Sequence, residues 1–281
     1  MKIQDRIGMY AALLGLCTGI VACSHEPVSP SLIPGSATQA VIPATLTGRI
    51  VYTLSGNLRV YDVATRTDVA LGVAGVNPKF SQDGTLIVYQ TSGSIRVMNS
   101  DGTNNRLVNA TGGIPSFDST GTMIAYRDNG IWKINVDGTG KTQLTTDGYH
   151  PAWSPNGAQI AFHAWNGSSD QLFLMNADGT NRHQALSSGT VLDIVWTPSA
   201  KLLFGVLVER SNYEIHSYDP AVPTSLTRLT ANRGNDFEPS WSPDGTGICF
   251  TSGLGGIWIM NADGSGQFQI NSKGRQSSWG K

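Results

Sequence analysis

The feature that most constrains the fold is a phrase that returns along the chain and is clearest at 239–250, Pro-Ser-Trp-Ser-Pro-Asp-Gly-Thr-Gly-Ile-Cys-Phe. Its Pro-Asp-Gly favours a tight turn, because proline presets the first central position and glycine accepts positive φ. The aromatic and β-branched residues on both sides favour pleated strands with a buried face. A lone hairpin cannot bury such a face. The phrase therefore predicts hairpins that pack against copies of themselves.

The phrase recurs at a regular spacing. Its aromatic residue returns at Phe80, Phe117, Trp153, Trp196, Trp241 and Trp279. A second hairpin with an Asp-Gly turn, a strong hairpin signal, follows most copies. Four antiparallel strands in about 40 residues is typical of a propeller blade. We therefore predict an all-β fold, a six-bladed β-propeller of four-stranded antiparallel blades.

The two ends of the repeat region complement each other. Residues 48–71 supply three strands without an aromatic first strand, and Trp279 lies in such a strand near the C-terminus. We expect the C-terminal strand to pair with the N-terminal blade and close the ring, which removes an exposed sheet edge. The expected organisation is a signal segment at 1–22, a proline-rich tether at 23–46 and the propeller at 47–281.

The N-terminus is typical of an exported protein. Lys2 and Arg6 precede an apolar run at 7–22. Cys23 follows Val-Ala directly, an arrangement that resembles the lipobox of bacterial lipoproteins. The resemblance implies cleavage before Cys23, acylation of Cys23, and a lipid anchor in the bacterial envelope. Ser24 then points to the outer membrane, facing the periplasm. The alternative is an ordinary signal peptide or a short membrane helix, although the run is shorter than the ~20 residues that a spanning helix needs.

Charge excludes one class of partner. The formal net charge is −1, only 14% of residues are charged, and Lys and Arg form no blocks. Nucleic-acid binding needs a basic patch to neutralise phosphates. We therefore expect no DNA or RNA partner.

The repeats are similar to those of the TolB-type β-propellers, in P-x-W-S-P-D-G, then I-A-F, then M-N-A-D-G. The resemblance covers about 48–279. It implies a non-enzymatic protein- or peptide-binding scaffold in the periplasm, with an envelope protein or peptide, Tol-Pal-like components included, as partner of a monomeric domain. TolB has a folded domain ahead of its propeller, and here we expect only the tether in that place. The copy at Trp196 also departs from the pattern, because its turn lacks the glycine.

The connections between blades predict a binding face. Residues that enter each first strand are expected to surround the central channel: Asn77, Ile114, His150, Asp193, Glu238 and Gln276. Outside them we expect a rim formed by Tyr149, Trp165, Glu209, Arg210, Tyr213, Arg233, Asp236 and Arg275. Aromatic and arginine side chains are enriched where proteins bind proteins. The plainer interpretation is that these are solvated loop residues.

Signals for catalysis are weak. The five histidines show no metal-binding spacing such as H-E-x-x-H, and no G-x-S-x-G or phosphate loop is present. We expect no catalytic residue, metal or cofactor, and we expect His183 and His216 to be solvated on outer hairpins. The alternative is a carbohydrate-active propeller, because the repeats also resemble those of oligogalacturonide lyases, which use a metal and His in the channel. Independently of that alternative, His150 and His163 are the two histidines that could approach each other, with Asp147 or Asp193 nearby, as a metal site or an acid/base pair.

Overall fold

The structure is a computed structural model that describes residues 46–187, 189–209 and 212–281. The predicted signal segment, Cys23, Arg210 and all of the tether except Leu46 lie outside the described residues. Within the described ranges, no helix has the length and apolar character that a membrane crossing requires.

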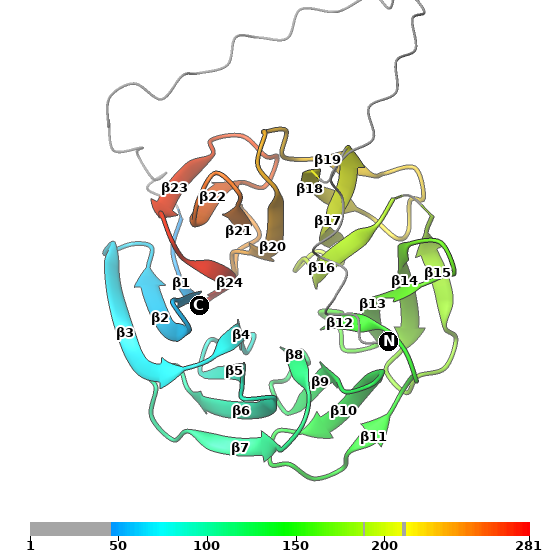
Figure 1. The fold of residues 1–281 in the computed structure, drawn as a ribbon, viewed down its shortest axis with the longest axis horizontal. Helices are drawn as coiled ribbons and strands as arrows, with labels where there is room; N and C mark the ends of the chain where they lie inside the picture. Colours follow the sequence, from blue (N-terminus) through cyan, green and yellow to red (C-terminus); the bar gives the residue numbers. More distant parts are fainter. Residues whose placement is uncertain (1–45, 188, 210–211) are drawn as a thin grey trace, which may run out of the picture. The chain divides into compact units, whose positions relative to one another are not determined.

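The described residues form six four-stranded antiparallel sheets arranged as blades around one axis (Figure 1). The first strands, nearest the axis, are β24 (Arg275–Gly280), β4 (Val76–Phe80), β8 (Gly113–Phe117), β12 (Tyr149–Trp153), β16 (Val191–Trp196) and β20 (Asp236–Trp241). The second strands are β1 (Arg49–Leu54), β5 (Leu86–Thr91), β9 (Met123–Arg127), β13 (Gln159–Trp165), β17 (Leu202–Glu209) and β21 (Gly247–Ser252). The third strands are β2 (Asn57–Asp62), β6 (Ser94–Asn99), β10 (Ile131–Asn135), β14 (Asp170–Asn176), β18 (Asn212–Tyr218) and β22 (Ile257–Asn261). The outer strands are β3 (Thr67–Ala74), β7 (Arg106–Asn109), β11 (Thr142–Gln143), β15 (His183–Leu186), β19 (Thr227–Arg228) and β23 (Phe268–Asn271).

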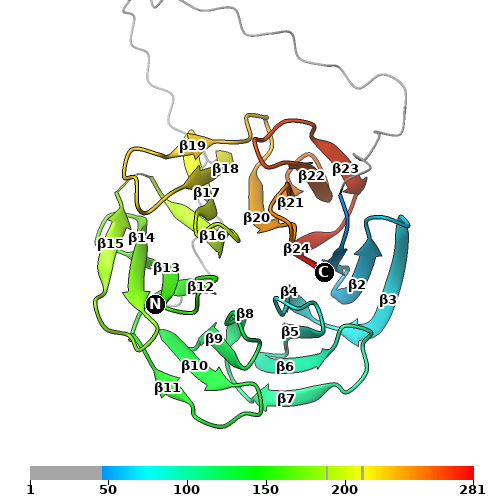
Figure 2. The ribbon, with the colours of Figure 1, turned by 180° about the vertical axis from the view of Figure 1, so that it is seen from behind.

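Blade 1 is built from both ends of the described chain. Its strand order is β24-β1-β2-β3, whereas blades 2 to 6 take their strands consecutively from β4 to β23. Trp279 of β24 lies opposite Ile50 of β1. The indole Nε1 of Trp279 also donates a hydrogen bond to the Thr47 carbonyl at 2.9 Å. Seen from either side, the C-terminus lies next to β1 (Figures 1 and 2). The predicted six blades and the predicted ring closure are both confirmed.

The core lies between neighbouring blades. Each second strand packs against a blade on both of its faces, so its sequence is a continuous apolar run without alternation, such as Ile-Val-Tyr or Ile-Cys-Phe. One position of this run carries a large aromatic ring in every blade, and each of these rings is less than 2% exposed: Tyr52, Tyr89, Tyr126, Phe162, Phe204 and Phe250. Cys249 is fully buried in the same run, as expected for a small core residue.

The turn of the repeated phrase is held by its own side chains. Ser242 donates a hydrogen bond through Oγ to Asp244 Oδ1 at 2.6 Å and accepts one from the Gly247 amide at 2.8 Å. Gly245 adopts φ of 74°, a conformation that favours glycine. The Ser-Pro-Asp-Gly sequence is thus explained by local turn chemistry.

Every first strand contains the same β-bulge. In blade 4, for example, Tyr149 pairs with His163 and Ala152 pairs with Ala161. Between these two pairs β12 advances by three residues and β13 by only two, so β12 contains one extra residue. The extra residue has left-handed backbone, with φ between 50° and 57°, in all six blades: Asn77, Ile114, His150, Asp193, Glu238 and Gln276. These are the residues that the sequence placed at the entry to each first strand. A bulge redirects a side chain, and here it does so six times around one axis.

Candidate functional site

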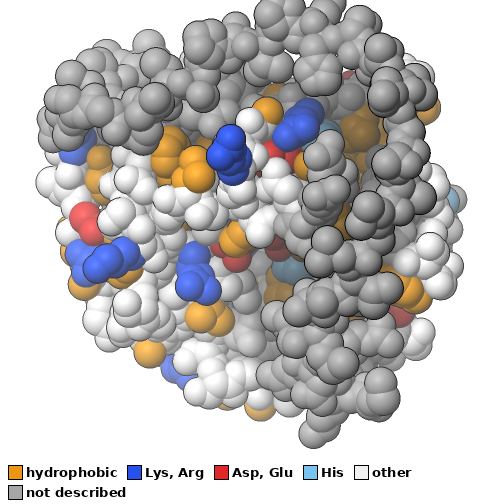
Figure 3. Space-filling view, turned by 45° about the horizontal axis from the view of Figure 1, so that its top comes forward, with side chains coloured by type: hydrophobic (Ala, Val, Ile, Leu, Met, Phe, Trp, Pro, Cys, Tyr) orange, Lys and Arg blue, Asp and Glu red, His pale blue; other side chains and the backbone are white. Residues whose placement is uncertain are grey.

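The six bulge residues, which we call the inner ring, line one cavity of about 320 Å³ that follows the central channel. Lys79, Ser116, Ser240 and Ser278 line the same cavity. The space-filling view shows acidic side chains beside a histidine in a shaded depression of the surface, with Lys or Arg side chains nearby (Figure 3). The channel mouth is therefore polar and carries both signs of charge.

Inner-ring side chains tie successive blades together. Asp193 Oδ2 accepts a hydrogen bond from the Glu238 amide at 3.3 Å, and Glu238 Oε2 accepts one from the Gln276 amide at 2.7 Å. Gln276 continues the series, because its Oε1 accepts from the Asn77 amide at 3.1 Å and its Nε2 donates to Asn77 Oδ1 at 2.7 Å. From blade 5 through blades 6 and 1 to blade 2, each side chain thus fixes the backbone of the next bulge.

Blades 4 and 5 meet through a chain of four titratable groups. His150 Nε2 lies 2.9 Å from Asp193 Oδ1, and His150 Nδ1 lies 2.7 Å from His163 Nε2. The two rings stack with their centroids 5.0 Å apart. On the far side, His163 Nδ1 lies 3.4 Å from Asp170 Oδ1. The predicted approach of His150, His163 and Asp193 is confirmed.

Asp147, the other carboxylate considered for this cluster, lies elsewhere. It forms a two-point ion pair with Arg182, at 2.6 Å and 2.9 Å.

Burial and neighbouring charges shift the pKa values at the mouth in both directions. Burial lowers the pKa of His163, against the opposing effect of Asp170. Burial would raise the pKa of Asp193, but His150 and Lys79 outweigh it and the net shift is downward. Burial raises the pKa of Glu238, and the nearby Asp193 adds to the rise. Burial lowers the pKa of Lys79, although Glu238 and Asp193 oppose the shift. Asp193 is thus the more firmly ionised of the two carboxylates.

A second ring of residues, of which the sequence had singled out only His163, lies behind the inner ring. It consists of the residues that directly follow the buried aromatic of each second strand: Thr53, Gln90, Arg127, His163, Gly205 and Thr251. Gln90 Oε1 accepts a hydrogen bond from Asn77 Nδ2 at 3.2 Å, and Thr251 Oγ1 donates one to Glu238 Oε2 at 2.7 Å. A polar residue directly after the buried aromatic is the signal for this second ring in every blade except blade 5, where the residue is Gly205. Lys79 was missed as well.

Only some of the predicted rim side chains are exposed to solvent. Trp165, at the end of β13, is 58% exposed. Tyr149 is half-buried and stacks on His163 with centroids 5.5 Å apart. Tyr213 is also half-buried, whereas Arg233 and Arg275 are exposed. Glu209 is the last residue of β17, and its side chain lies outside the described part of the structure.

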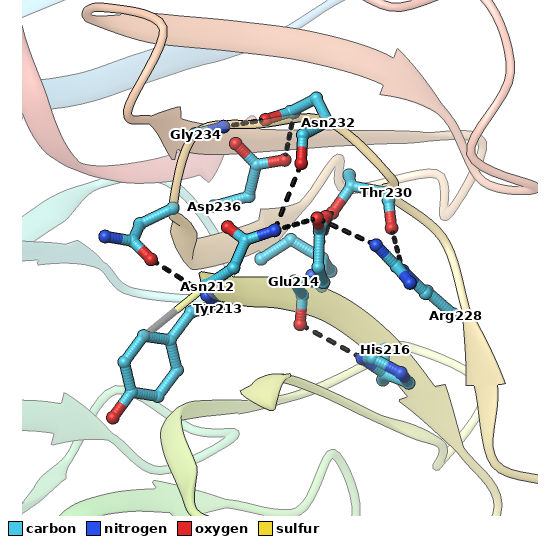
Figure 4. A network of polar contacts seen from close by, with 11 residues as sticks. Asn212, Tyr213, Glu214, His216, Arg228, Thr230, Asn232, Gly234 and Asp236 are labelled. Carbon is cyan, nitrogen blue, oxygen red and sulfur yellow. Dashed lines mark hydrogen bonds and ion pairs between the residues drawn. The ribbon is translucent and has the colours of Figure 1, made fainter. Parts of the chain in front are cut away.

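Asp236 differs from the prediction, because it is fully buried and not part of the rim. It begins β20, and its side chain turns beneath residues 232–234, where Asn232 Nδ2 donates a hydrogen bond to Asp236 Oδ2 at 2.5 Å (Figure 4). The same network contains the fully buried Glu214, which Arg228 Nη2 contacts at 2.9 Å. His216 was predicted to be solvated, and this was wrong: it is 7% exposed and contacts the Glu214 carbonyl through Nδ1 at 3.0 Å.

The geometry does not favour a metal-dependent site. Among the described residues, no three His, Cys, Asp or Glu side chains converge in a way that would hold a metal ion. Both ring nitrogens of His150 and Nε2 of His163 are engaged in contacts within the protein. His163 Nδ1 is buried without a hydrogen bond to another described residue, 3.4 Å from Asp170 Oδ1.

Comparison with known proteins agrees with this architecture. Residues 151–280 match the family model of the TolB beta propeller domain. A TolB homolog of Chlorobium luteolum is 29% identical over 143 residues, which cover 49% of this chain but only 32% of that relative. The chain thus matches about a third of that relative's length.

Two solved structures have a similar fold. TolB from Acinetobacter baumannii aligns with a TM-score of 0.71 at 19% identity, over 83% of this chain and 66% of that one. An oligogalacturonate lyase in complex with manganese aligns with a TM-score of 0.52 at 16% identity, over 77% and 70% of the two chains. The chain is a six-bladed β-propeller, and residues 151–280 are similar in sequence to the TolB beta propeller domain.

Proposed function

We propose that this protein is a non-enzymatic scaffold that binds a segment of another protein, or a peptide, at the channel mouth. The observation that carries the proposal is the inner ring, in which six non-glycine residues at positive φ line one cavity. Left-handed backbone at such residues costs about 1–3 kcal/mol each and is concentrated at functional sites. Hydrogen bonds between blades hold these groups in place, which lowers the entropy lost on binding.

The size and chemistry of the mouth favour a side chain or a loop tip as ligand. A cavity of about 320 Å³ is at the small end of ligand pockets. The exposed ring of Trp165 and the half-buried rings of Tyr149 and Tyr213 lie outside the inner ring. Aromatic side chains of this kind dominate many protein–protein interfaces. In the proposed complex, one or a few partner side chains enter the mouth and the rim contacts the surrounding backbone.

The proposed setting is the bacterial envelope. It is supported by the positively charged and apolar leader at 1–22, by Cys23 in its lipobox-like position, and by the similarity to TolB. In this setting a lipid on Cys23 holds the propeller at the outer membrane, facing the periplasm. The partner is an envelope protein or peptide, with Tol-Pal-like components among the candidates.

The double variant His150→Ala, Glu238→Gln tests the proposal. Chemical cross-linking in intact envelopes, followed by capture of this protein, should give roughly a tenfold lower partner yield, because central interface residues each contribute more than about 1 kcal/mol. The matched control is His183→Ala, Asp101→Asn, which removes the same kinds of group from exposed positions on an outer strand and an outer turn. Equal partner yields from both double variants and the parent would refute binding at the inner ring.

A further inference from the structure

A second cavity, of about 280 Å³, adjoins the channel mouth between blades 2 and 3. Gln90 and Gly93 of blade 2 line it, together with Gly113, Ile114 and Arg127 of blade 3. Ile114 also lines the central cavity. A peptide in the channel mouth therefore has a neighbouring hollow into which one further side chain can extend.

Arg127 is the second-ring residue whose inner-ring neighbour cannot pair with it. In blades 2, 4 and 6 the second-ring side chain contacts the polar inner-ring side chain of its own blade, at 3.2, 2.7 and 2.7 Å. The inner-ring residue of blade 3 is Ile114, which has no polar side-chain atom. Arg127 Nε is buried and has no hydrogen-bond partner among the described residues. A buried donor without a partner is costly, so the Arg127 guanidinium holds an unsatisfied donor beside this cavity.

The guanidinium is held in position by an aromatic stack. It lies over the Tyr149 ring at 4.2 Å, and its Nη2 donates a hydrogen bond to a Tyr149 hydroxyl 3.3 Å away. Tyr149 in turn stacks on His163. The carboxylate of Asp128, which also lines this cavity, is engaged through Oδ2 with Thr111 Oγ1 at 2.7 Å and Lys141 Nζ at 3.6 Å. Arg127 is therefore oriented, and Asp128 is occupied by other groups.

We propose that Arg127 forms a carboxylate-binding subsite beside the channel mouth. Its guanidinium fork binds the carboxylate of an Asp or Glu side chain, or of a chain terminus, on the peptide that occupies the mouth. Arginine suits this task because its planar donors match a carboxylate at two points. The proposal rests on the proposed function and adds the chemistry of the partner: an acidic group toward blade 3, opposite the carboxylates of Asp193 and Glu238 on blades 5 and 6.

Arginine side-chain NMR on the full protein tests the subsite directly. Three probes distinguish a side-chain carboxylate from a terminal one. N-acetylglutamate amide has a carboxylate on its side chain, and N-acetylglutamine has one at its terminus. N-acetylglutamine amide has no carboxylate and is the neutral probe. The Arg127 Nε–H signal should shift saturably with at least one of the two acids, with a midpoint on the order of 10 mM, and not with the neutral probe. Arg182 is the internal control, because it also lies over aromatic rings but is already paired with Asp147.

Variants complete the test. Arg127→Lys keeps the charge but loses the fork, and it should lower partner capture about tenfold. Arg182→Lys should leave capture unchanged. Equal shifts of Arg127 and Arg182, or equal shifts with the neutral probe, would overturn the subsite. If the subsite fails while His150→Ala, Glu238→Gln still reduces capture, the proposed function stands without it. If Arg127 responds but that double variant has no effect, the proposed function fails.

Discussion

Trp279→Ala is expected to lower the free energy of unfolding by about 3–5 kcal/mol, the usual cost of removing a large buried aromatic side chain. Trp279 is 5% exposed and packs in a cluster with Leu46, Ile50 and Cys249. It also closes the ring, because β24 is the C-terminal strand that pairs with β1. Removal of residues 275–281 should be more severe and prevent the propeller from folding, since β1 would then present an unpaired edge.

Urea unfolding followed by circular dichroism measures both changes. Trp165→Ala is the matched control, because Trp165 is 58% exposed, and its effect should stay within about 0.5 kcal/mol. Equal loss of stability in the two tryptophan variants would contradict the role given to β24.

Asp236→Asn is expected to gain stability over the parent protein as the pH rises. Burial raises the pKa of Asp236 from 3.8 to about 6. Below pH 3.8 the carboxyl group is protonated in both the folded and the unfolded states. Between pH 3.8 and 6 the unfolded state ionises while the folded state does not, so the stability of the parent falls. Above pH 6 the penalty is complete, and a shift of this size corresponds to about 3 kcal/mol.

The measurement is the difference in unfolding free energy between Asp236→Asn and the parent at pH 4 and at pH 7.5. This difference should move by about 2.4 kcal/mol in favour of the variant, because part of the penalty is already present at pH 4. Asp101→Asn should move in the opposite direction, because hydrogen bonds from Thr103 lower the pKa of Asp101. A difference that stays flat for Asp236→Asn would show that its carboxyl group does not titrate as its burial implies.

The fold was predictable because the repeat encodes it several times over. Turn residues, apolar runs and one aromatic anchor agree in each copy, and the incomplete first copy required Trp279 to complete it. The inner-ring positions followed from the same counting. The left-handed bulge itself was not predictable, because Ile114, Glu238 and Gln276 are not residues that favour positive φ.

The predictions about individual polar residues were less successful, for a physical reason. Sequence places a residue in a loop or strand but does not say which side chain closes over it. Asp236 was expected at the surface, and the segment that contains Asn232 covers it. Arg127 was not singled out because its significance depends on Ile114 in a neighbouring strand and on Tyr149 in the next blade. Such contacts between blades have no local sequence pattern.

Site-specific photo-cross-linking tests the central claim most directly. A photoreactive phenylalanine derivative replaces Trp165 beside the channel mouth or, as control, Thr139, an exposed residue in the outer turn between β10 and β11 that does not line the cavity. Irradiation of intact envelopes should give a covalent partner adduct from position 165 and not from position 139, and His150→Ala, Glu238→Gln should abolish it. An adduct that forms equally from both positions, or from position 139 alone, would contradict binding at the channel mouth.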